Sequence, residues 1–290
     1  MIHQPHFNAR VVLLAVLGCF TCSVFSAAEA QTVRRAAVET VIYAFTGGSD
    51  GGNPSSNLLV DASGALYGTT TSGGNTDCIN GHTACGVVFR LSPLGSTYVE
   101  QVLYRFRGGA DGATPVQGLI RDKAGSLYGT TFYGGNSSCF GGCGTVYKLT
   151  PQGSGYHETV LYRFGGGNDG KYAGAALIAD RTGALYGTPV QGGDVACEAA
   201  GCGTVFELEP RGSTYTESIL YRFHGGLDGM YPGTSLIIEK DALAGTTDAG
   251  GGSNAACSSG CGTVFRLRGT KRQKAARSGG PQRLREPCGA

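Results

Sequence analysis

The chain has 290 residues, of which 41% are hydrophobic and 15% are charged, with 23 basic against 21 acidic residues. This length is enough for a large core or a repeat array, and the scarcity of charge argues against a disordered body. Gly is abundant, with 51 copies, which disfavours long helices. Most basic excess lies in the last twenty residues, so the mildly acidic remainder argues against a nucleic-acid-binding protein.

The first thirty residues have the pattern of an export signal. A polar start ends at Arg10, an apolar run follows over residues 11–25, and small residues precede a predicted cleavage after Ala30. The apolar run is short for a transmembrane helix, although a membrane anchor remains an alternative. Lipidation of Cys19 fits poorly, because the residues before it do not form a good lipobox. We therefore predict a signal peptide over residues 1–30 and a mature chain that is secreted, periplasmic or at the cell surface, without an integral membrane segment.

An internal repeat dominates the rest of the sequence. Three short motifs recur in the same order with a period of about 59 residues, so four copies are present. The motifs are "YAF" or "YRF" at residues 43, 104, 162 and 221, "LYGTT" or a close variant at 66, 127, 185 and 243, and "CGVVF" or "CGTV" followed by Phe or Tyr at 85, 143, 202 and 261.

Each repeat contains four segments with strand character, and we label them a to d. In the second unit, strands a, b and c are residues 117–122, 126–131 and 144–150. Strand d of the same blade is the counterpart, in the next unit, of residues 98–106. These segments alternate or are rich in β-branched and aromatic residues. Four short antiparallel strands per repeat predict an all-β fold, a four-bladed β-propeller over residues 31–269, followed by a basic, disordered tail over 270–290.

The strand count also predicts how the ring closes. The chain enters at residues 38–45, which match a d strand, and leaves on a c strand at residues 262–267. The first strand would thus complete the last blade and remove its exposed edge. An open solenoid is the alternative to this closed ring. We also expect the protein to be a monomer.

The units resemble a known family at the motifs "LYGTT..GG" and "GTVF.L", which recur together at this spacing. They look like the GloVer-type tandem repeat of bacterial surface and secreted proteins, also described as choice-of-anchor repeat proteins, over residues 38–268. The resemblance implies export and a repeat fold, without an established reaction or catalytic residues. The tail lacks the sorting or anchoring pattern that such proteins often carry, so release is favoured over surface attachment.

Eight cysteines fall as one pair per repeat, each between strands b and c. An exported chain meets oxidising conditions, so the pairs predict local disulfides, while a zinc site would need further ligands. Bridges over such short loops would mainly fix loop shape. The predicted pairs are Cys78–Cys85, Cys139–Cys143, Cys197–Cys202 and Cys257–Cys261, and Cys288 is left alone in the tail.

One acidic residue recurs in each connection from strand d to strand a, followed by Gly. A ring of four carboxylates could bind a cation or a hydroxyl-rich ligand, whereas Asp-Gly is also an ordinary turn pair. One carboxylate per loop is weak support for calcium, and we expect no cofactor and no metal. The four residues are Asp50, Asp111, Asp169 and Asp228.

Antiparallel topology places the d-to-a and b-to-c connections at the same end of every blade, so we expect a face of long loops. Loops on rigid scaffolds commonly carry function. The polar and aromatic loop residues that differ between repeats, and so favour one off-centre site, are His82, Tyr133, Phe140, Lys171, Tyr172, His224 and Tyr231. We predict a non-enzymatic protein that binds an extracellular glycan, polymer or protein there; the alternative is a hydrolase or lyase with an active site on this face, and no catalytic residue stands out.

Overall fold

The computed structural model describes residues 37–74, 78, 85–193, 197, 200–253 and 255–269. The predicted signal peptide, the predicted tail with Cys288, and His82 therefore lie outside the described residues. The chain divides into two units at Thr40. The described part of the first unit, residues 37–40, is exposed and forms no strand. Everything that follows concerns the second unit, residues 41–290.

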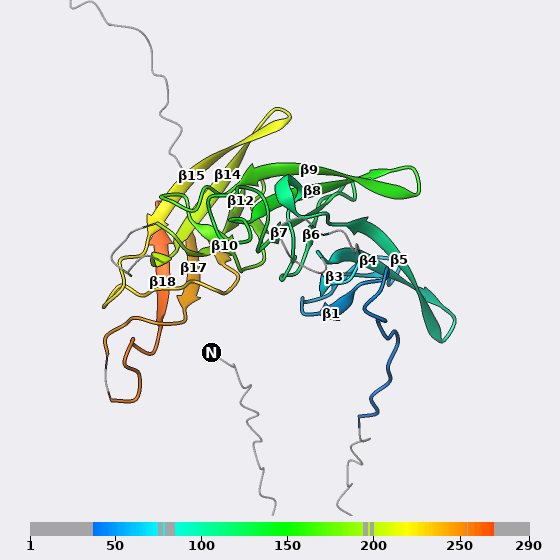
Figure 1. Cartoon of the computed structure of the whole chain (residues 1–290), viewed down its shortest axis with the longest axis horizontal. Coiled ribbons are helices and arrows are strands. Elements are labelled where there is room, and N and C mark those ends of the chain that lie inside the picture. Colours follow the sequence, from blue (N-terminus) through cyan, green and yellow to red (C-terminus); the bar gives the residue numbers. More distant parts are fainter. Residues whose placement is uncertain are drawn as a thin grey trace, which may run out of the picture. The chain divides into compact units, whose positions relative to one another are not determined.

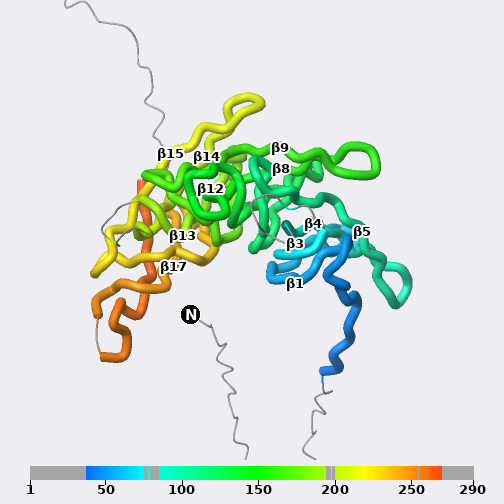
Figure 2. Tube along the Cα trace, viewed as in Figure 1, coloured from blue at the N-terminus to red at the C-terminus, as the bar shows by residue number. Residues whose placement is uncertain are grey.

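The described chain is all-β apart from short 3-10 segments, namely η1 (Gly109–Asp111) and 3-10 positions at Cys197 and Ala200. Four antiparallel sheets follow one another in sequence order and are arranged as a four-bladed β-propeller, as predicted (Figure 1, Figure 2). Blade 1 contains β2 (Leu59–Val60), β3 (Leu66–Ser72), β4 (Val87–Leu94) and β5 (Thr97–Arg105); blade 2 contains β6 (Ile120–Arg121), β7 (Leu127–Thr131), β8 (Thr145–Gln152) and β9 (Gly155–Arg163); blade 3 contains β11 (Ile178–Ala179), β12 (Leu185–Gly187), β14 (Thr204–Arg211) and β15 (Thr214–Arg222); blade 4 contains β16 (Ile237–Glu239), β17 (Ala242–Thr247) and β18 (Thr263–Arg268).

Three further short strands come from the loops of the first and third blades. β1 (Gly52–Pro54) pairs antiparallel with β3, and β10 (Lys171–Ala173) pairs antiparallel with β13 (Pro189–Gln191). They join the loop that enters a blade to the loop that leaves its second strand. These ladders therefore tie the two kinds of long connection together.

The long hairpin of each complete blade shows why the sequence forms strands there. In blade 2, β8 and β9 pair over their whole length, and Gln152 lies opposite Gly155. The turn between them contains Gly153 with φ of +58°, a left-handed conformation that glycine adopts without steric cost. A register shift after the first Val–Tyr pair recurs at the same place in blades 1, 2 and 3. The repeated motif thus encodes one repeated hairpin.

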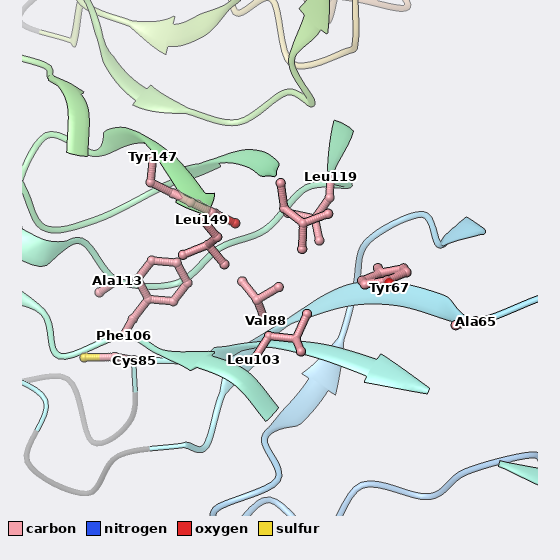
Figure 3. Close-up of a cluster of buried hydrophobic side chains, with 11 residues drawn as sticks. Ala65, Tyr67, Cys85, Val88, Leu103, Phe106, Ala113, Leu119, Tyr147 and Leu149 are labelled. Atoms are coloured by element: carbon pink, nitrogen blue, oxygen red, sulfur yellow. The ribbon is translucent and has the colours of Figure 1, made fainter. Parts of the chain in front are cut away.

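Consecutive blades meet in hydrophobic clusters, and we call each such contact a junction. At the first junction Val88 and Leu103 of blade 1 face Leu119 and Tyr147 of blade 2, and all four side chains are buried (Figure 3). Equivalent clusters join blades 2 and 3 and blades 3 and 4. Burial of one such side chain contributes roughly 1.5–3 kcal/mol, so the junctions hold much of the stability of the fold.

One aromatic contact recurs at every junction. The Phe that ends the outer strand of a blade packs edge-on against the aromatic residue on the third strand of the next blade. Its ring centroid lies 5.0 Å from its partner for Phe106–Tyr147, 5.3 Å for Phe164–Phe206 and 5.1 Å for Phe223–Phe265. Phe45 makes the same contact with Phe89 at 4.8 Å. Edge-to-face pairs of this kind add about 0.5–1.5 kcal/mol to the burial term.

The predicted closing strand is the one element that the structure does not form. Residues 41–46 belong to no strand, and β18 pairs only with β17, so the described part of blade 4 has three strands. This segment also lacks a hydrogen bond that the other outer strands make. In the other outer strands an Arg side chain donates from Nε to a loop carbonyl, as Arg105 does to Ser49 at 3.2 Å, with the same bond at Arg163 and Arg222. Ala44 stands at this position and cannot make the bond.

The Tyr147 hydroxyl gives a test of junction packing. Tyr147 is fully buried, its hydroxyl has no hydrogen-bond partner among the described residues, and the equivalent residues are Phe89, Phe206 and Phe265. Tyr147→Phe should therefore raise the free energy of unfolding by about 1 kcal/mol, because a buried unsatisfied hydroxyl is removed. Urea denaturation measures the change.

The matched control for this substitution is Tyr128→Phe. The Tyr128 hydroxyl donates to Asp122 at 3.0 Å, so its removal should lower the free energy of unfolding by about 1 kcal/mol. Equal losses for the two variants would show that the Tyr147 hydroxyl is satisfied in solution.

Candidate functional site

The two kinds of long connection lie together at one end of every blade, as the topology predicts. In blade 2 the amide of Gly135, in the loop between the second and third strands, donates to the carbonyl of Gly109, in the loop that enters the blade, at 2.7 Å. The same bond joins Gly74 to Gly48, Gly193 to Gly167 and Gly251 to Gly226 at 2.8–2.9 Å. We call this end of the blades the long-loop face.

All four cysteine pairs on the long-loop face are disulfides, as predicted: Cys78–Cys85, Cys139–Cys143, Cys197–Cys202 and Cys257–Cys261. Their role extends beyond fixing loop shape. The Cys143 carbonyl accepts a hydrogen bond from the Tyr172 amide of blade 3 at 2.8 Å, and Cys85 and Cys202 accept the equivalent bonds. A side chain at Gly166 would overlap the sulfur of Cys139, so the bridge packs directly on the next blade.

The residues that donate these bonds have an unusual backbone. Thr114, Tyr172 and Tyr231 have φ of +57°, +60° and +60°, and Asn53 has +55° at the equivalent place in the first repeat. This left-handed conformation is uncommon for residues other than Gly and Asn and costs roughly 1 kcal/mol or more. The bond to the neighbouring blade therefore offsets local strain and fixes the direction of these side chains.

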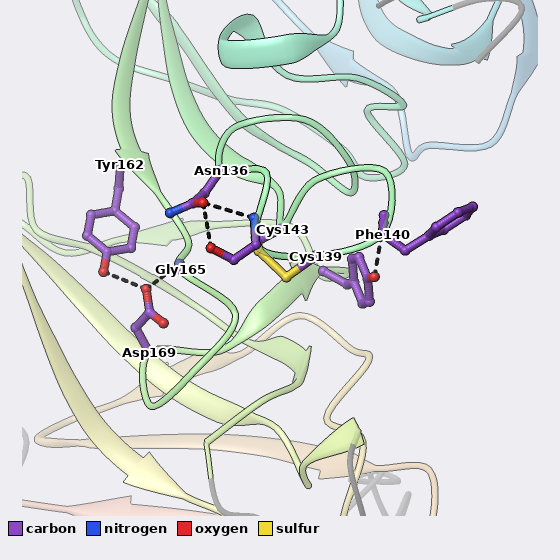
Figure 4. The surroundings of a disulfide bond; sticks show 9 residues. Asn136, Cys139, Phe140, Cys143, Tyr162, Gly165 and Asp169 are labelled. Atoms are coloured by element: carbon purple, nitrogen blue, oxygen red, sulfur yellow. Dashed lines mark hydrogen bonds between the residues drawn. A yellow bond between two sulfur atoms is a disulfide. The ribbon is translucent and has the colours of Figure 1, made fainter. Parts of the chain in front are cut away.

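The four predicted acidic residues have the same partners in every repeat. Each carboxylate accepts from the hydroxyl of the Tyr seven residues before it and from a backbone amide four residues before it. Asp169 accepts from Tyr162 at 2.9 Å and from the Gly165 amide at 2.7 Å (Figure 4). Asp50, Asp111 and Asp228 repeat both bonds.

These bonds also affect protonation. Burial tends to raise the pKa of Asp50, but hydrogen bonds from Thr46 and Tyr43 outweigh it, so the pKa is lowered. The hydrogen bond to Asp228, together with burial, raises the pKa of Tyr221 to about 12. The Asp50 carboxylate therefore stays ionised as an acceptor within its own loop. Binding of an external ligand by the four of them stays a prediction.

A second set of carboxyl groups lies at the junctions, on the outer strands. Glu100, Glu158 and Glu217 are partly buried, and one oxygen of each has no hydrogen-bond partner among the described residues. Burial, and then the negative charge of Asp111, raises the pKa of Glu158 to about 7. Burial and the charge of Asp169 raise that of Glu217 to about 7. Perturbed carboxyls can mark a catalytic site, but recurrence at equivalent places indicates a shared packing environment instead.

One part of the long-loop face differs between repeats. The ring of Phe132 in blade 2 stacks on Tyr172 of blade 3 with centroids 4.9 Å apart and planes 8° apart. Tyr133 packs edge-on against both rings, and the Lys171 ammonium lies 5.6 Å from the centre of the Tyr172 ring. The other repeats have Thr71, Val190 and Asp248 in place of Phe132. We call Phe132, Tyr133, Phe140, Lys171 and Tyr172 the aromatic cluster.

Phe140 projects from this cluster into solvent. It lies between the two cysteines of the Cys139–Cys143 bridge, and 91% of its surface is exposed. Its carbonyl accepts a hydrogen bond from the Tyr172 hydroxyl at 3.1 Å, so the loop is fixed to the cluster while the ring points outward (Figure 4). Asn136 further orders the loop, accepting from Ser138 and, through its carbonyl, from the Cys143 amide.

The structure thus brings together Tyr133, Phe140, Lys171 and Tyr172 from the predicted loop residues. His224 lies instead beside Tyr221 in the next loop, with ring centroids 6.3 Å apart, and Tyr231 is part of the junction to blade 3. Phe132 was missed by the sequence reasoning. Its replacement of the Thr found in the first repeat was the available signal.

The junction glutamates predict a pH dependence of stability. A carboxyl whose folded-state pKa lies above its ordinary 4.5 binds a proton more tightly when folded. The contribution of each such glutamate to the free energy of unfolding is therefore fully present below about pH 4.5 and is lost as the pH rises through about 7. The double variant Glu158→Gln, Glu217→Gln should gain about 1 kcal/mol per site at pH 8 and show little change at pH 4, after discounting for solvent screening.

Thermal unfolding at a series of pH values tests this dependence. Glu209→Gln is the control, because Glu209 is exposed and pairs with Arg211 on the surface. A stability gain that is the same at pH 4 and pH 8 would contradict the assignment of the effect to ionisation.

Comparison with solved structures finds low similarity. A provisionally named gluconolactonase is 13% identical, with 74% of this chain and 63% of that chain covered and a TM-score of 0.38. A provisionally named 6-phosphogluconolactonase from Bacteroides uniformis is 12% identical, with coverage of 74% and 57% and a TM-score of 0.43. The phage phi92 endosialidase is 15% identical, with coverage of 77% and 36% and a TM-score of 0.39.

The chain thus spans about three-fifths of the length of the first two of these structures. Similarity at this level carries no information about activity. No curated protein matches the chain.

Comparison with protein families gives a definite result. A sequence model of the Gloeobacter/Verrucomicrobia repeat matches residues 26–198, which include the first two full repeats and most of the third. This match agrees with the resemblance seen in the recurring motifs. The chain belongs to the Gloeobacter/Verrucomicrobia repeat family.

Proposed function

We propose that this protein is an exported, non-enzymatic β-propeller that binds an extracellular glycan, polymer or protein through its long-loop face. Four disulfides fit an oxidising compartment outside the cytoplasm. Among the described residues no helix is long and apolar enough to cross a membrane. The predicted signal peptide supplies the route of export.

The exposure of Phe140 is the observation that carries the binding proposal. A large aromatic side chain at 91% exposure gains nothing for folding. Here it is also held in place by a disulfide and by the Tyr172 hydroxyl. An aromatic anchor that is ordered before binding loses little entropy when it is covered, and such residues often dominate interfaces.

The rest of the aromatic cluster supports the anchor. The Phe132–Tyr172 stack joins blades 2 and 3 beneath the loop, and Lys171 adds a positive charge beside it. The cluster occurs once among the four repeats. A single anchored site, rather than a symmetric ring, is therefore the arrangement that this face favours.

Binding is tested with the mature chain on an array of extracellular glycans, polymers and surface proteins. Phe140→Ala should lower the affinity for any ligand found by about tenfold or more, because a central aromatic anchor contributes at least about 1.4 kcal/mol. The thermal midpoint should not change, since Phe140 makes no packing contribution to the core.

The matched control is Leu94→Ala. Leu94 is also exposed, at 64%, but is the last residue of β4, beside the hairpin turn to β5 at the opposite end of the blade. An equal loss of affinity in both variants would contradict binding at the long-loop face. Turnover of the bound ligand would contradict the proposal that the protein is not an enzyme.

A further inference from the structure

The end of blade 4 exposes residues that are buried everywhere else in the propeller. Val264 on β18 is 84% exposed, whereas its equivalents Val88, Val146 and Val205 are completely buried. Since the surrounding motif is the same, the sequence of β18 is that of a strand covered by another blade. What differs is only the absence of a cover in the described chain.

The start of blade 1 shows the complementary exposure. Leu58 is 52% exposed, while its equivalents Leu119, Leu177 and Leu236 are exposed by only 6%, 1% and 2%. Ile42 is 39% exposed, against 7% for the equivalent Leu103. At the first intact junction, Leu119 belongs to the blade that receives the preceding one, and Leu103 belongs to the preceding blade itself. The chain therefore carries both halves of a fourth junction, and both are open.

The outer edge of β18 adds polar backbone groups to this exposed surface. β18 pairs with β17 on one side only, so its other edge presents backbone groups that can pair with a further strand. Exposed strand edges of this kind recruit other chains unless they are covered. In blades 1, 2 and 3 this edge is covered by β5, β9 and β15.

The segment able to cover this edge is already partly ordered on blade 1. Residues 41–45 follow the pattern of the outer strands, Tyr43 donates to Asp50, and Phe45 packs on Phe89. Both contacts repeat those of Tyr104 and Phe106 at the first junction. The segment is thus held as the end of an outer strand while its own pairing edge remains unused.

We propose that the end of blade 4 is an interface for a second copy of this chain. Continuity with the three intact junctions identifies the covering element as a blade of this repeat, and the chain's own segment leaves β18 uncovered. In the dimer, β18 of each copy pairs with residues 41–45 of the other, and Val264 of one copy packs near Ile42 and Leu58 of the other. Two such contacts close on each other and leave no open edge. In this proposal the protein is a dimer, whereas a monomer is expected from the sequence.

The strand register of the intact blades shows which two residues should lie opposite each other in the dimer. Val87 lies opposite Arg105, Thr145 opposite Arg163, and Thr204 opposite Arg222. The equivalent pair in the dimer is Thr263 of one copy and Ala44 of the other. Paired residues on antiparallel strands have Cα atoms about 4.5–5.5 Å apart, which a disulfide can span.

Two single variants, Ala44→Cys and Thr263→Cys, are prepared in the mature chain with Cys288→Ala, mixed and oxidised. The expected result is a disulfide-linked dimer on a non-reducing gel for the mixture and not for either variant alone. Light scattering of the chain without added cysteines should give twice the monomer mass. Val264→Lys should halve that mass without changing the far-ultraviolet spectrum, because Val264 is exposed within one copy.

Two results would overturn the proposal. If one chain that carries both cysteines forms an internal disulfide and remains monomeric, its own segment closes the ring. If neither arrangement gives a cross-link and the mass is that of one chain, the end of blade 4 is not an interface between copies.

Discussion

The edge-to-face contact between the last Phe of one blade and the aromatic residue on the next is the interaction on which the fold depends. It links the end of each outer strand, where the polypeptide leaves a blade, to the middle of the following sheet. Around it gather the buried aliphatic residues of each junction. Because the contact joins neighbours in sequence, blades add one after another, and stability depends on nearest-neighbour interfaces.

The sequence predicted the strands, the blade count and the disulfides because each depends on local or repeated pattern. Alternation over "YHETVLYRF" predicts β9, and four copies of one motif predict four blades. The cysteine pairs were assigned correctly because their members are close in sequence and recur in every b-to-c loop. The grouping of the long loops followed from antiparallel topology alone.

Features that join different repeats were harder to predict. The Phe132–Tyr172 stack needs both the blade-to-blade spacing and the left-handed backbone at Tyr172, and nothing in a single repeat indicates either. The closing strand was expected from its pattern, yet pattern does not specify which edge a strand pairs with. The substitution of Ala44 for the Arg of the other outer strands was visible, but its meaning depended on a loop carbonyl revealed only by the structure.

The disulfide loops overlap in one direction, which gives the propeller a polarity. Each of the first three bridges lies on its own blade but contacts the blade that follows, through the carbonyl of its second cysteine. Reduction of Cys139–Cys143 would therefore loosen the backbone around Tyr172 in blade 3 while leaving the attachment of blade 2 to blade 1 intact. Loss of a bridge therefore affects the blade that follows it in the chain and not the blade that precedes it. The order of the repeats thus has mechanical consequences, although their structures are nearly alike.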